Sequence, residues 1–290
     1  MGDFRYGYPS HAKEAGRPPQ AEAVAMSRLV TLTTDFGPTG PFVAVMHGVI
    51  LSRAPELRIV DLTHDILVHW PAEAGFWLSR AFRYFPAGSV HVAVVDPGVG
   101  TGRDIIAVEH AGHVFLAPDN GLLGQLLEQA ADAPVYRLDP DWQARQDWPA
   151  PSHTFHGRDI FAPLAADIAS GRCRPADIGP RVSEVVPSLL EPPSVSGREL
   201  KGSIVSVDHF GNLISNIDAG LLEGFREPRV QAAGHSLPLK QTYGQVRPGD
   251  CLALINSFAV VEIACAEGSA AERLGLGRGA PVSIVEGRYV

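Results

Sequence analysis

The sequence lacks any run of about 18 consecutive apolar residues, so we expect no helix that spans a membrane. It also lacks a cluster of basic residues. Its 24 lysines and arginines are outnumbered by 32 aspartates and glutamates, which gives a net charge of −8. A protein that grips nucleic-acid phosphates usually presents a basic face. The composition therefore argues against nucleic acid and membranes as partners.

Cysteine is scarce as well, with only Cys173, Cys251 and Cys265 and no CxxC pair. This pattern predicts neither a zinc site nor a disulfide framework, and it fits a reducing cytoplasm. His64 and Asp65 have no further ligand at a convincing spacing, so no metal is expected. The sequence also has no GxSxG elbow and no GxGxxG or GK[ST] phosphate loop.

The chain divides into four stretches of different character. Residues 1–27 are rich in glycine, proline and alanine, which predicts a disordered extension. Over 28–186, β-branched runs alternate with helical periodicity, which is typical of an α/β domain with a mostly parallel central sheet. Residues 187–200 are rich in proline and serine and are predicted to be a linker. Short strands separated by turns over 201–290 predict a small barrel or sandwich.

Particular elements follow from the same patterns. We expect helices over 42–54, 71–84, 121–130 and 158–171, with a short one near 269–274. Strands are expected over 28–34, 57–62, 89–95, 105–108, 113–117 and 135–138.

Four aspartates lie at or just after the ends of predicted strands. In a parallel sheet, ligands bind beyond the carboxyl ends of the strands, so this clustering predicts a site at that edge. The four residues are Asp35, Asp61, Asp96 and Asp119.

Asp35 lies in the segment TTDFG, at the end of the first strand. A carboxylate in this position can hold the two vicinal hydroxyls of a ribose. The position equally suits an aspartate that caps the next helix or turn.

Asp96 and Arg103 stand at the two ends of the segment DPGVGTGR. Its proline and three glycines predict a tight loop whose backbone can approach a ligand closely. The two charged ends can meet across this loop, either as a structural ion pair or as part of a catalytic site.

His156 lies in TFHGRD, just before a predicted helix. The positive end of the helix dipole favours a neutral imidazole, which can accept a proton, although a capping role fits too. Farther on, the segment DHFGN from Asp208 to Asn212 offers an aromatic ring and an amide that suit a purine. The same letters also describe an ordinary β-turn.

Taken in order, these motifs resemble one family, the S-adenosyl-L-methionine hydroxide adenosyltransferases, which are relatives of the fluorinase and chlorinase. The resemblance runs from about residue 29 to the C-terminus. The matching segments are TTDFG (33–37), IVDLTH (59–64), YFPAGSVHVAVVDPGVGTGR (84–103), FLAPDNGLL (115–123), TFHGRDIFAP (154–163), VDHFGNLISNI (207–217) and INSFAVVEIA (255–264).

The resemblance implies an N-terminal α/β domain, a C-terminal β-barrel and a homotrimer with the substrate between two subunits. It implies hydrolysis of S-adenosyl-L-methionine to adenosine and L-methionine, by in-line attack of activated water at ribose C5′ and without a cofactor. The catalytic triad of the family corresponds to Asp96, Arg103 and His156. The ribose-binding aspartate corresponds to Asp35.

Further substrate contacts are carried over residue by residue. Asp208 corresponds to the residue that binds the methionine amine, and Ser257 to one that holds the methionine end. Phe210 and Asn212 fall where relatives contact adenine. The neighbours of the triad histidine complete the predicted substrate-binding set, which adds Phe155 and Gly157.

Two positions favour water over halide as the nucleophile. The halogenating relatives have tyrosine where this chain has Asp96, and serine where it has Gly157. The alternatives are a chlorinase-like adenosyltransferase and a non-catalytic protein that binds S-adenosyl-L-methionine or adenosine.

Several positions depart from the family pattern, among them His69 and Trp70, and most of them lie near the expected methionine end. Gly40 stands where relatives have an acidic residue, and His47 replaces a common lysine. Phe258 and Cys265 occupy arginine positions of the halogenating relatives.

Overall fold

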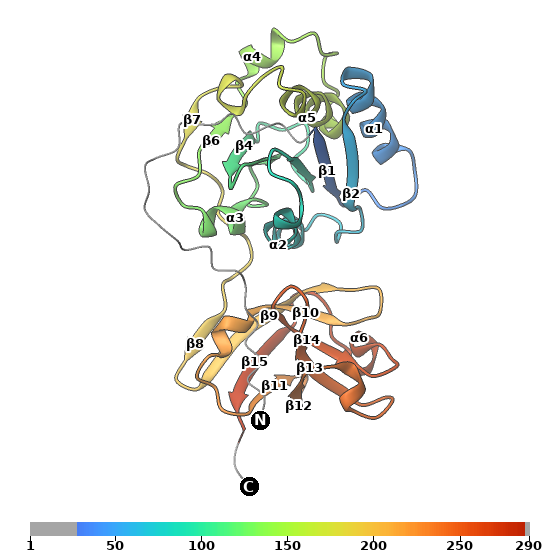
Figure 1. Ribbon diagram of the computed structural model, residues 1–290, viewed down its shortest axis with the longest axis vertical. Coiled ribbons are helices and arrows are strands. Elements are labelled where there is room, and N and C mark those ends of the chain that lie inside the picture. The colour runs from blue at the N-terminus through green and yellow to red at the C-terminus, as the bar shows by residue number, and fades with distance from the viewer. Residues whose placement is uncertain (1–27, 288–290) are drawn as a thin grey trace.

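The computed structural model describes residues 28–287, so the extension predicted over 1–27 lies outside the described residues. An α/β part comes first in the chain, and a β-barrel follows it (Figure 1). Both predicted architectures are confirmed. Across the described residues, none of the helices combines the length and apolarity that crossing a membrane requires.

The α/β part is built on a seven-stranded sheet with the order β2-β1-β3-β5-β4-β6-β7. Four neighbouring strands are parallel and form the half that carries the predicted site: β1 (Leu29–Thr34), β2 (Arg58–Thr63), β3 (Val90–Val94) and β5 (His113–Pro118). The other three pair antiparallel: β4 (Ile105–His110), β6 (Val135–Arg137) and β7 (Arg181–Val182). The short turn between β4 and β5 leaves room only for a hairpin, which explains the change of direction.

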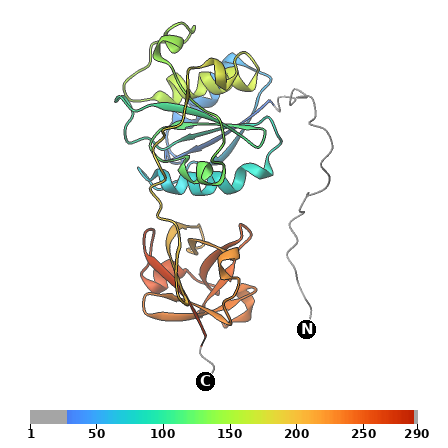
Figure 2. The ribbon, with the colours of Figure 1, turned by 90° about the vertical axis from the view of Figure 1, so that its left-hand side faces the viewer.

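Helices cover both faces of this sheet. On one face α1 (Phe42–Arg53) packs against α5 (Ala162–Ala169), and on the other α2 (Pro71–Ala81) packs against α3 (Gly124–Gln129). Figure 2 shows α2 on the side of the sheet that faces the barrel. A short helix, α4 (Pro140–Ala144), follows β6. The helix predicted over 158–171 is altered at its start, where Gly157–Phe161 form a π-turn before α5 begins.

The barrel closes because β10 pairs with both β14 and β9. Its seven strands are β9 (Glu199–Val207), β10 (Leu213–Asp218), β11 (Pro228–Ala232), β12 (His235–Lys240), β13 (Cys251–Ile255), β14 (Val260–Cys265) and β15 (Pro281–Glu286). Strand β8 (Ser194–Ser196) is added beside β9, inside the stretch predicted as a linker, and α6 (Ala270–Leu274) lies near the predicted short helix. The division of the chain at 186/187 and 200/201 stays a prediction.

The expectation of no disulfide was wrong. Cys251 on β13 and Cys265 on β14 are direct cross-strand partners and form a disulfide, while Cys173 is free. The two cysteines lie 14 positions apart in sequence, and the pairing of their strands brings them together.

Candidate active site

A cavity of about 310 Å³ lies at the carboxyl ends of β1 and β3, where the sequence predicted a site. Asp35 follows β1 and Asp96 follows β3, and both line the cavity. The predicted residues Phe155, His156 and Gly157 line it as well. The remaining lining residues are Phe36, Phe42, Val68, His69, Val94, Val99 and Thr154.

Asp96, Arg103 and His156 form one hydrogen-bonded cluster. The Arg103 Nε donates to both carboxylate oxygens of Asp96, at 3.1 and 2.9 Å. Its Nη2 donates to Asp96 Oδ2 and, at 2.8 Å, to His156 Nδ1. The Arg103 guanidinium is not among the groups that line the cavity, so it lies behind the two residues that do. The side chains of the ion pair are nearly buried, with exposed fractions of 4% for Asp96 and 11% for Arg103.

The Arg103 bond fixes the tautomer of His156. A guanidinium can only donate, so Nδ1 accepts and the proton of the neutral ring sits on Nε2. Burial and the positive charge of Arg103 both lower the pKa of His156 below its usual value of 6.5. The imidazole is therefore neutral at pH 7, as the sequence predicted, and it is a hydrogen-bond donor through Nε2.

A second carboxylate fixes the loop that carries His156. Asp159 in the π-turn accepts from the backbone N–H and the hydroxyl of Ser152, at 2.8 and 2.6 Å. The Ser152 hydroxyl in turn accepts from the Phe155 N–H at 3.1 Å. The sequence gave no sign of this link between Asp159 and Ser152, because the link depends on the shape of the 152–156 loop.

Glycine allows this loop to meet the loop from Asp96 to Arg103. Gly100 has a φ of +76°, and a Cβ there would stand 2.1 Å from the carbonyl oxygen of His153. The two loops are thus in backbone contact, which only a residue without a side chain permits at this position.

Asp35 is held by a backbone group of a neighbouring turn. Its Oδ2 accepts from the His69 N–H at 2.9 Å, and His69 has a left-handed φ of +65°. Three phenylalanine rings, those of Phe36, Phe42 and Phe155, meet edge to face beside it, with centroids 5.4 to 6.3 Å apart. The cavity therefore joins an apolar aromatic wall to a polar floor, a combination typical of small-molecule sites.

The predicted residues of the barrel do not line this cavity. The Asp208 carboxylate, in the β9–β10 loop, accepts three hydrogen bonds of 2.9 Å. Their donors are the backbone N–H groups of Phe210 and Asn212 and the side-chain amide of Asn212. Phe210 is 74% exposed at the tip, and Ser257 is exposed in the β13–β14 turn. Within one chain, the structure thus assembles the triad, Asp35, Phe155 and Gly157. The barrel residues form a separate set in which Phe210 and Ser257 are exposed, Asp208 is half-buried and Asn212 is buried.

A buried acid in the barrel escaped the sequence reasoning. Glu262 on β14 is 3% exposed and accepts from the Tyr243 hydroxyl at 2.8 Å and from the Asn256 amide at 3.2 Å. Burial raises the pKa of Glu262, and burial together with Glu262 raises the pKa of Tyr243 to about 12. Asn256 in turn accepts from the Phe258 N–H, so this network shapes the turn that carries Ser257.

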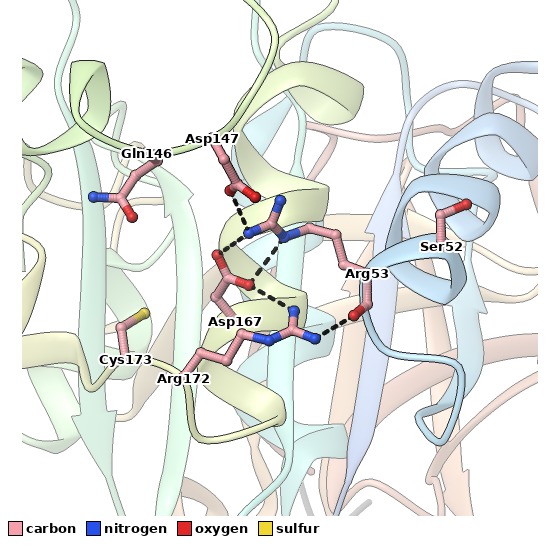
Figure 3. Close-up of a pocket in the computed structure, with 7 residues that line it drawn as sticks. All are labelled: Ser52, Arg53, Gln146, Asp147, Asp167, Arg172 and Cys173. Carbon is pink, nitrogen blue, oxygen red and sulfur yellow. Dashed lines mark hydrogen bonds and ion pairs between the residues drawn. The ribbon is translucent and has the colours of Figure 1, made fainter.

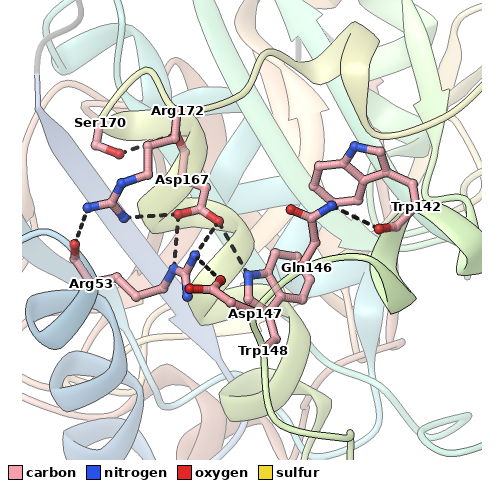
Figure 4. Close-up of polar contacts among 8 residues, drawn as sticks. All are labelled: Arg53, Trp142, Gln146, Asp147, Trp148, Asp167, Ser170 and Arg172. Atoms are coloured by element: carbon pink, nitrogen blue, oxygen red, sulfur yellow. Dashed lines mark hydrogen bonds and ion pairs between the residues drawn. The ribbon is translucent and has the colours of Figure 1, made fainter.

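A larger cavity, of about 460 Å³, lies between α1 and α5 (Figure 3). Asp167 accepts there from Arg53, Arg172 and the Trp148 indole, and Arg53 also pairs with Asp147 (Figure 4). Two guanidinium groups thus face two carboxylates, and Arg172 donates to the Arg53 carbonyl at the end of α1. We interpret this network as a structural link between two helices, because its charges balance one another.

The fold and the site define a class of protein in which an α/β sheet carries an aspartate–arginine–histidine cluster at its ligand-binding edge and a closed barrel follows. More narrowly, the chain belongs to the S-adenosyl-L-methionine hydroxide adenosyltransferase family. Residues 30–179 match the N-terminal domain of that family and residues 202–283 match its C-terminal domain.

Individual relatives agree with this assignment. An (R)-S-adenosyl-L-methionine hydrolase from Thermus thermophilus is 37% identical and covers 89% of this chain and 100% of its own length. A protein of the same name from Salinispora arenicola is 36% identical, over 91% and 100%. A fluorinase from an Actinoplanes species is more distant, at 28% over 81% and 90%. An uncharacterized conserved protein from Thermotoga maritima has a similar solved structure, with a TM-score of 0.81, 31% identity and coverage of 89% and 100%.

Proposed function

We propose that this chain hydrolyses S-adenosyl-L-methionine to adenosine and L-methionine. The observation that carries the proposal is the Asp96–Arg103–His156 cluster, which presents a carboxylate and an imidazole to a cavity that Asp35 also lines. The names of the hydrolase relatives support the same reaction. The reaction is expected to need no cofactor or metal, and the protein is proposed to act in the cytoplasm.

The chemistry needs a positioned nucleophile more than an acid. Water attacks ribose C5′ in line with the C5′–S bond, the new C–O bond forms, and the bonding electrons leave with sulfur as the neutral thioether of methionine. Asp96 takes the proton that water loses. The single acceptor nitrogen of the neutral His156 ring, Nδ1, is filled by the Arg103 hydrogen bond, whereas the Asp96 carboxylate keeps free lone pairs beside its bonds to Arg103. The His156 Nε2–H donates to the attacking oxygen, and the Arg103 charge stabilises the forming hydroxide and holds both partners in place.

The substrate contacts divide between the two parts of the chain. In this proposal Asp35 holds the ribose hydroxyls, while Phe155 and Gly157 contact the substrate beside the reacting carbon. Asp208, Phe210, Asn212 and Ser257 come from the barrel of a neighbouring subunit in a homotrimer.

Exposed apolar groups on both surfaces support the trimer. Phe210 is 74% exposed on the barrel, and Val68 and Phe42 are 59% and 50% exposed at the cavity. Burying such apolar side chains against another subunit is favourable, because it removes apolar surface from water. Light scattering on the purified protein tests this point, and a monomer at assay concentration would contradict it.

The reaction is tested by incubating the purified protein with S-adenosyl-L-methionine in ¹⁸O-labelled water. We expect adenosine and L-methionine in equal amounts, with the label in the 5′-hydroxyl of adenosine. Folded trimer that binds substrate without releasing methionine would instead establish a binding protein. Chloride-dependent formation of 5′-chloro-5′-deoxyadenosine would establish a halide-using enzyme.

The pH profile follows from the lowered pKa of His156. A protonated imidazole cannot accept the Arg103 hydrogen bond and repels its charge, so kcat/KM is expected to fall as the pH drops through the pKa of His156. Because burial and Arg103 lower that pKa, the acidic limb should have an apparent pKa below 6.5, with a plateau above it. The profile is obtained by measuring kcat and kcat/KM at each pH. An acidic limb of kcat/KM with an apparent pKa above 6.5 would contradict the role given to His156.

A further inference from the structure

Glu73 is a buried carboxylate on α2 that faces the barrel. Only 1% of it is exposed. It accepts from the Arg278 Nε through both oxygens, at 3.0 and 2.9 Å, and from the Ser206 hydroxyl at 2.5 Å. Ser206 is on β9, and Arg278 lies between α6 and β15. The carboxylate is therefore an ion-pair partner across the junction between the α/β part and the barrel.

The same carboxylate also holds a turn of its own domain. Its Oε2 accepts from the Leu67 N–H at 2.9 Å, and the Trp70 N–H closes the turn by donating to the Leu67 carbonyl at 3.0 Å. This turn, residues 67–70, is the segment that contributes Val68 and His69 to the cavity wall.

The turn ends in the hydrogen bond to Asp35. His69 adopts a left-handed backbone, which a side chain disfavours unless surrounding contacts enforce it. In that conformation its N–H donates to Asp35 Oδ2 at 2.9 Å. A continuous chain of contacts thus runs from Arg278 through Glu73 and the turn to Asp35.

A buried ion pair is a poor way to gain stability, because the cost of removing two charges from water offsets much of their attraction. Apolar packing is already present at this junction, where Phe76 of α2 lies in one cluster with Ile214 and Val260 of the barrel. The ion pair is therefore better explained by the position in which it holds the neighbouring groups than by a contribution to the stability of the fold.

We infer that the Arg278–Glu73 pair is a positioning device that sets turn 67–70 and thereby holds Asp35 in place for the ribose hydroxyls. The inference rests on the proposed function in one respect, which is the assignment of Asp35 to ribose. Through this pair, the geometry of the ribose site in the α/β part depends on how the barrel of the same chain packs against α2. Glu73 and Arg278 touch no substrate and act only through the turn.

The first test compares steady-state constants of Arg278→Met and Glu73→Gln with those of the wild type. A ribose contact is made alike in the ground state and the transition state, so its weakening raises KM more than it lowers kcat. We expect KM for S-adenosyl-L-methionine to rise about tenfold, the usual effect of losing a charge-assisted hydrogen bond, with kcat within about threefold. Arg278→Lys, which keeps the charge, should recover part of the loss.

Two control variants loosen the same junction without touching the turn. Asp218→Asn removes a second ion pair across the junction, Arg80 to Asp218 at 2.8 Å. Ile214→Val trims the apolar cluster. Both should keep KM within about twofold of the wild type. An equal rise of KM in the controls and in Arg278→Met would overturn the inference, because the pair would then act only by seating the barrel.

Hydrogen exchange gives a readout that does not need activity. In the ligand-free protein, amides of residues 67–70 should exchange about ten times faster in Arg278→Met than in the wild type or in Asp218→Asn. Unchanged exchange would overturn the inference while leaving the hydrolase proposal intact. If the wild type released no adenosine, the hydrolase proposal would fail, and the exchange comparison would still decide whether the pair sets the turn.

Discussion

Replacing Arg103 with methionine is expected to lower kcat by at least about a hundredfold while the Kd for S-adenosyl-L-methionine stays within about threefold. Arg103 contacts Asp96 and His156 but does not line the cavity, so its loss disorders the reacting groups more than the bound substrate. Single-turnover kinetics and equilibrium binding measure the two effects separately. A variant with unchanged kcat would remove Arg103 from the mechanism.

Controls separate this effect from misfolding. The substitution leaves the nearly buried Asp96 without its partner, which costs stability, so thermal unfolding must show that the variant is folded at the assay temperature. Arg103→Lys keeps a positive charge without the forked geometry, and we expect an intermediate kcat. Arg137→Met removes an exposed arginine that pairs with Asp104, next in sequence to Arg103, and it should leave kcat unchanged.

The second large effect is expected for Gly100→Ala. The new Cβ would stand 2.1 Å from the His153 carbonyl oxygen in a backbone conformation that costs a side chain about 1–2 kcal/mol, and the overlap adds about 1–3 kcal/mol. The melting temperature should fall by about 5–15 °C. Because the two loops that carry the triad would move apart, kcat should also fall about a hundredfold.

Gly102→Ala is the matched control for this prediction. It adds the same methyl group to the same loop, where nothing lies within 4 Å and the backbone is not left-handed. We expect a change in unfolding free energy within about 0.5 kcal/mol and an unchanged kcat. Equal effects of the two substitutions would mean that the contact between the loops has no role in holding the triad.

Much of the fold could be predicted because its signals are local. The β-branched runs and helical periodicity located β1, β3, α1 and α2, and the turn-separated short strands after residue 200 indicated the barrel. The antiparallel pairing beyond the β4–β5 hairpin, the π-turn at Gly157–Phe161 and the disulfide could not be predicted. Each depends on which strands or loops meet in space, and no residue near them in sequence records that choice.

The candidate site shows the same division. The motifs located Asp96, Arg103 and His156, and the structure adds the bond that fixes the His156 tautomer. The groups that hold those residues were missed: Ser152 behind Phe155, and Glu73 behind the 67–70 turn. A serine before a motif and a glutamate inside a helix carry no distinctive pattern, since their partners come from distant parts of the chain.

The helix α2 gives the molecule a mechanical property that neither half would have alone. Nine of its eleven residues are buried: Leu78 packs into the interior beneath the sheet, and Phe76 packs into the cluster shared with the barrel. Separating the barrel from this helix would expose the apolar side chains of the shared cluster on both halves. The two halves are therefore expected to unfold as one cooperative unit, and a fragment that ends before β8 is expected to present the outer side of α2 as an apolar surface prone to aggregation.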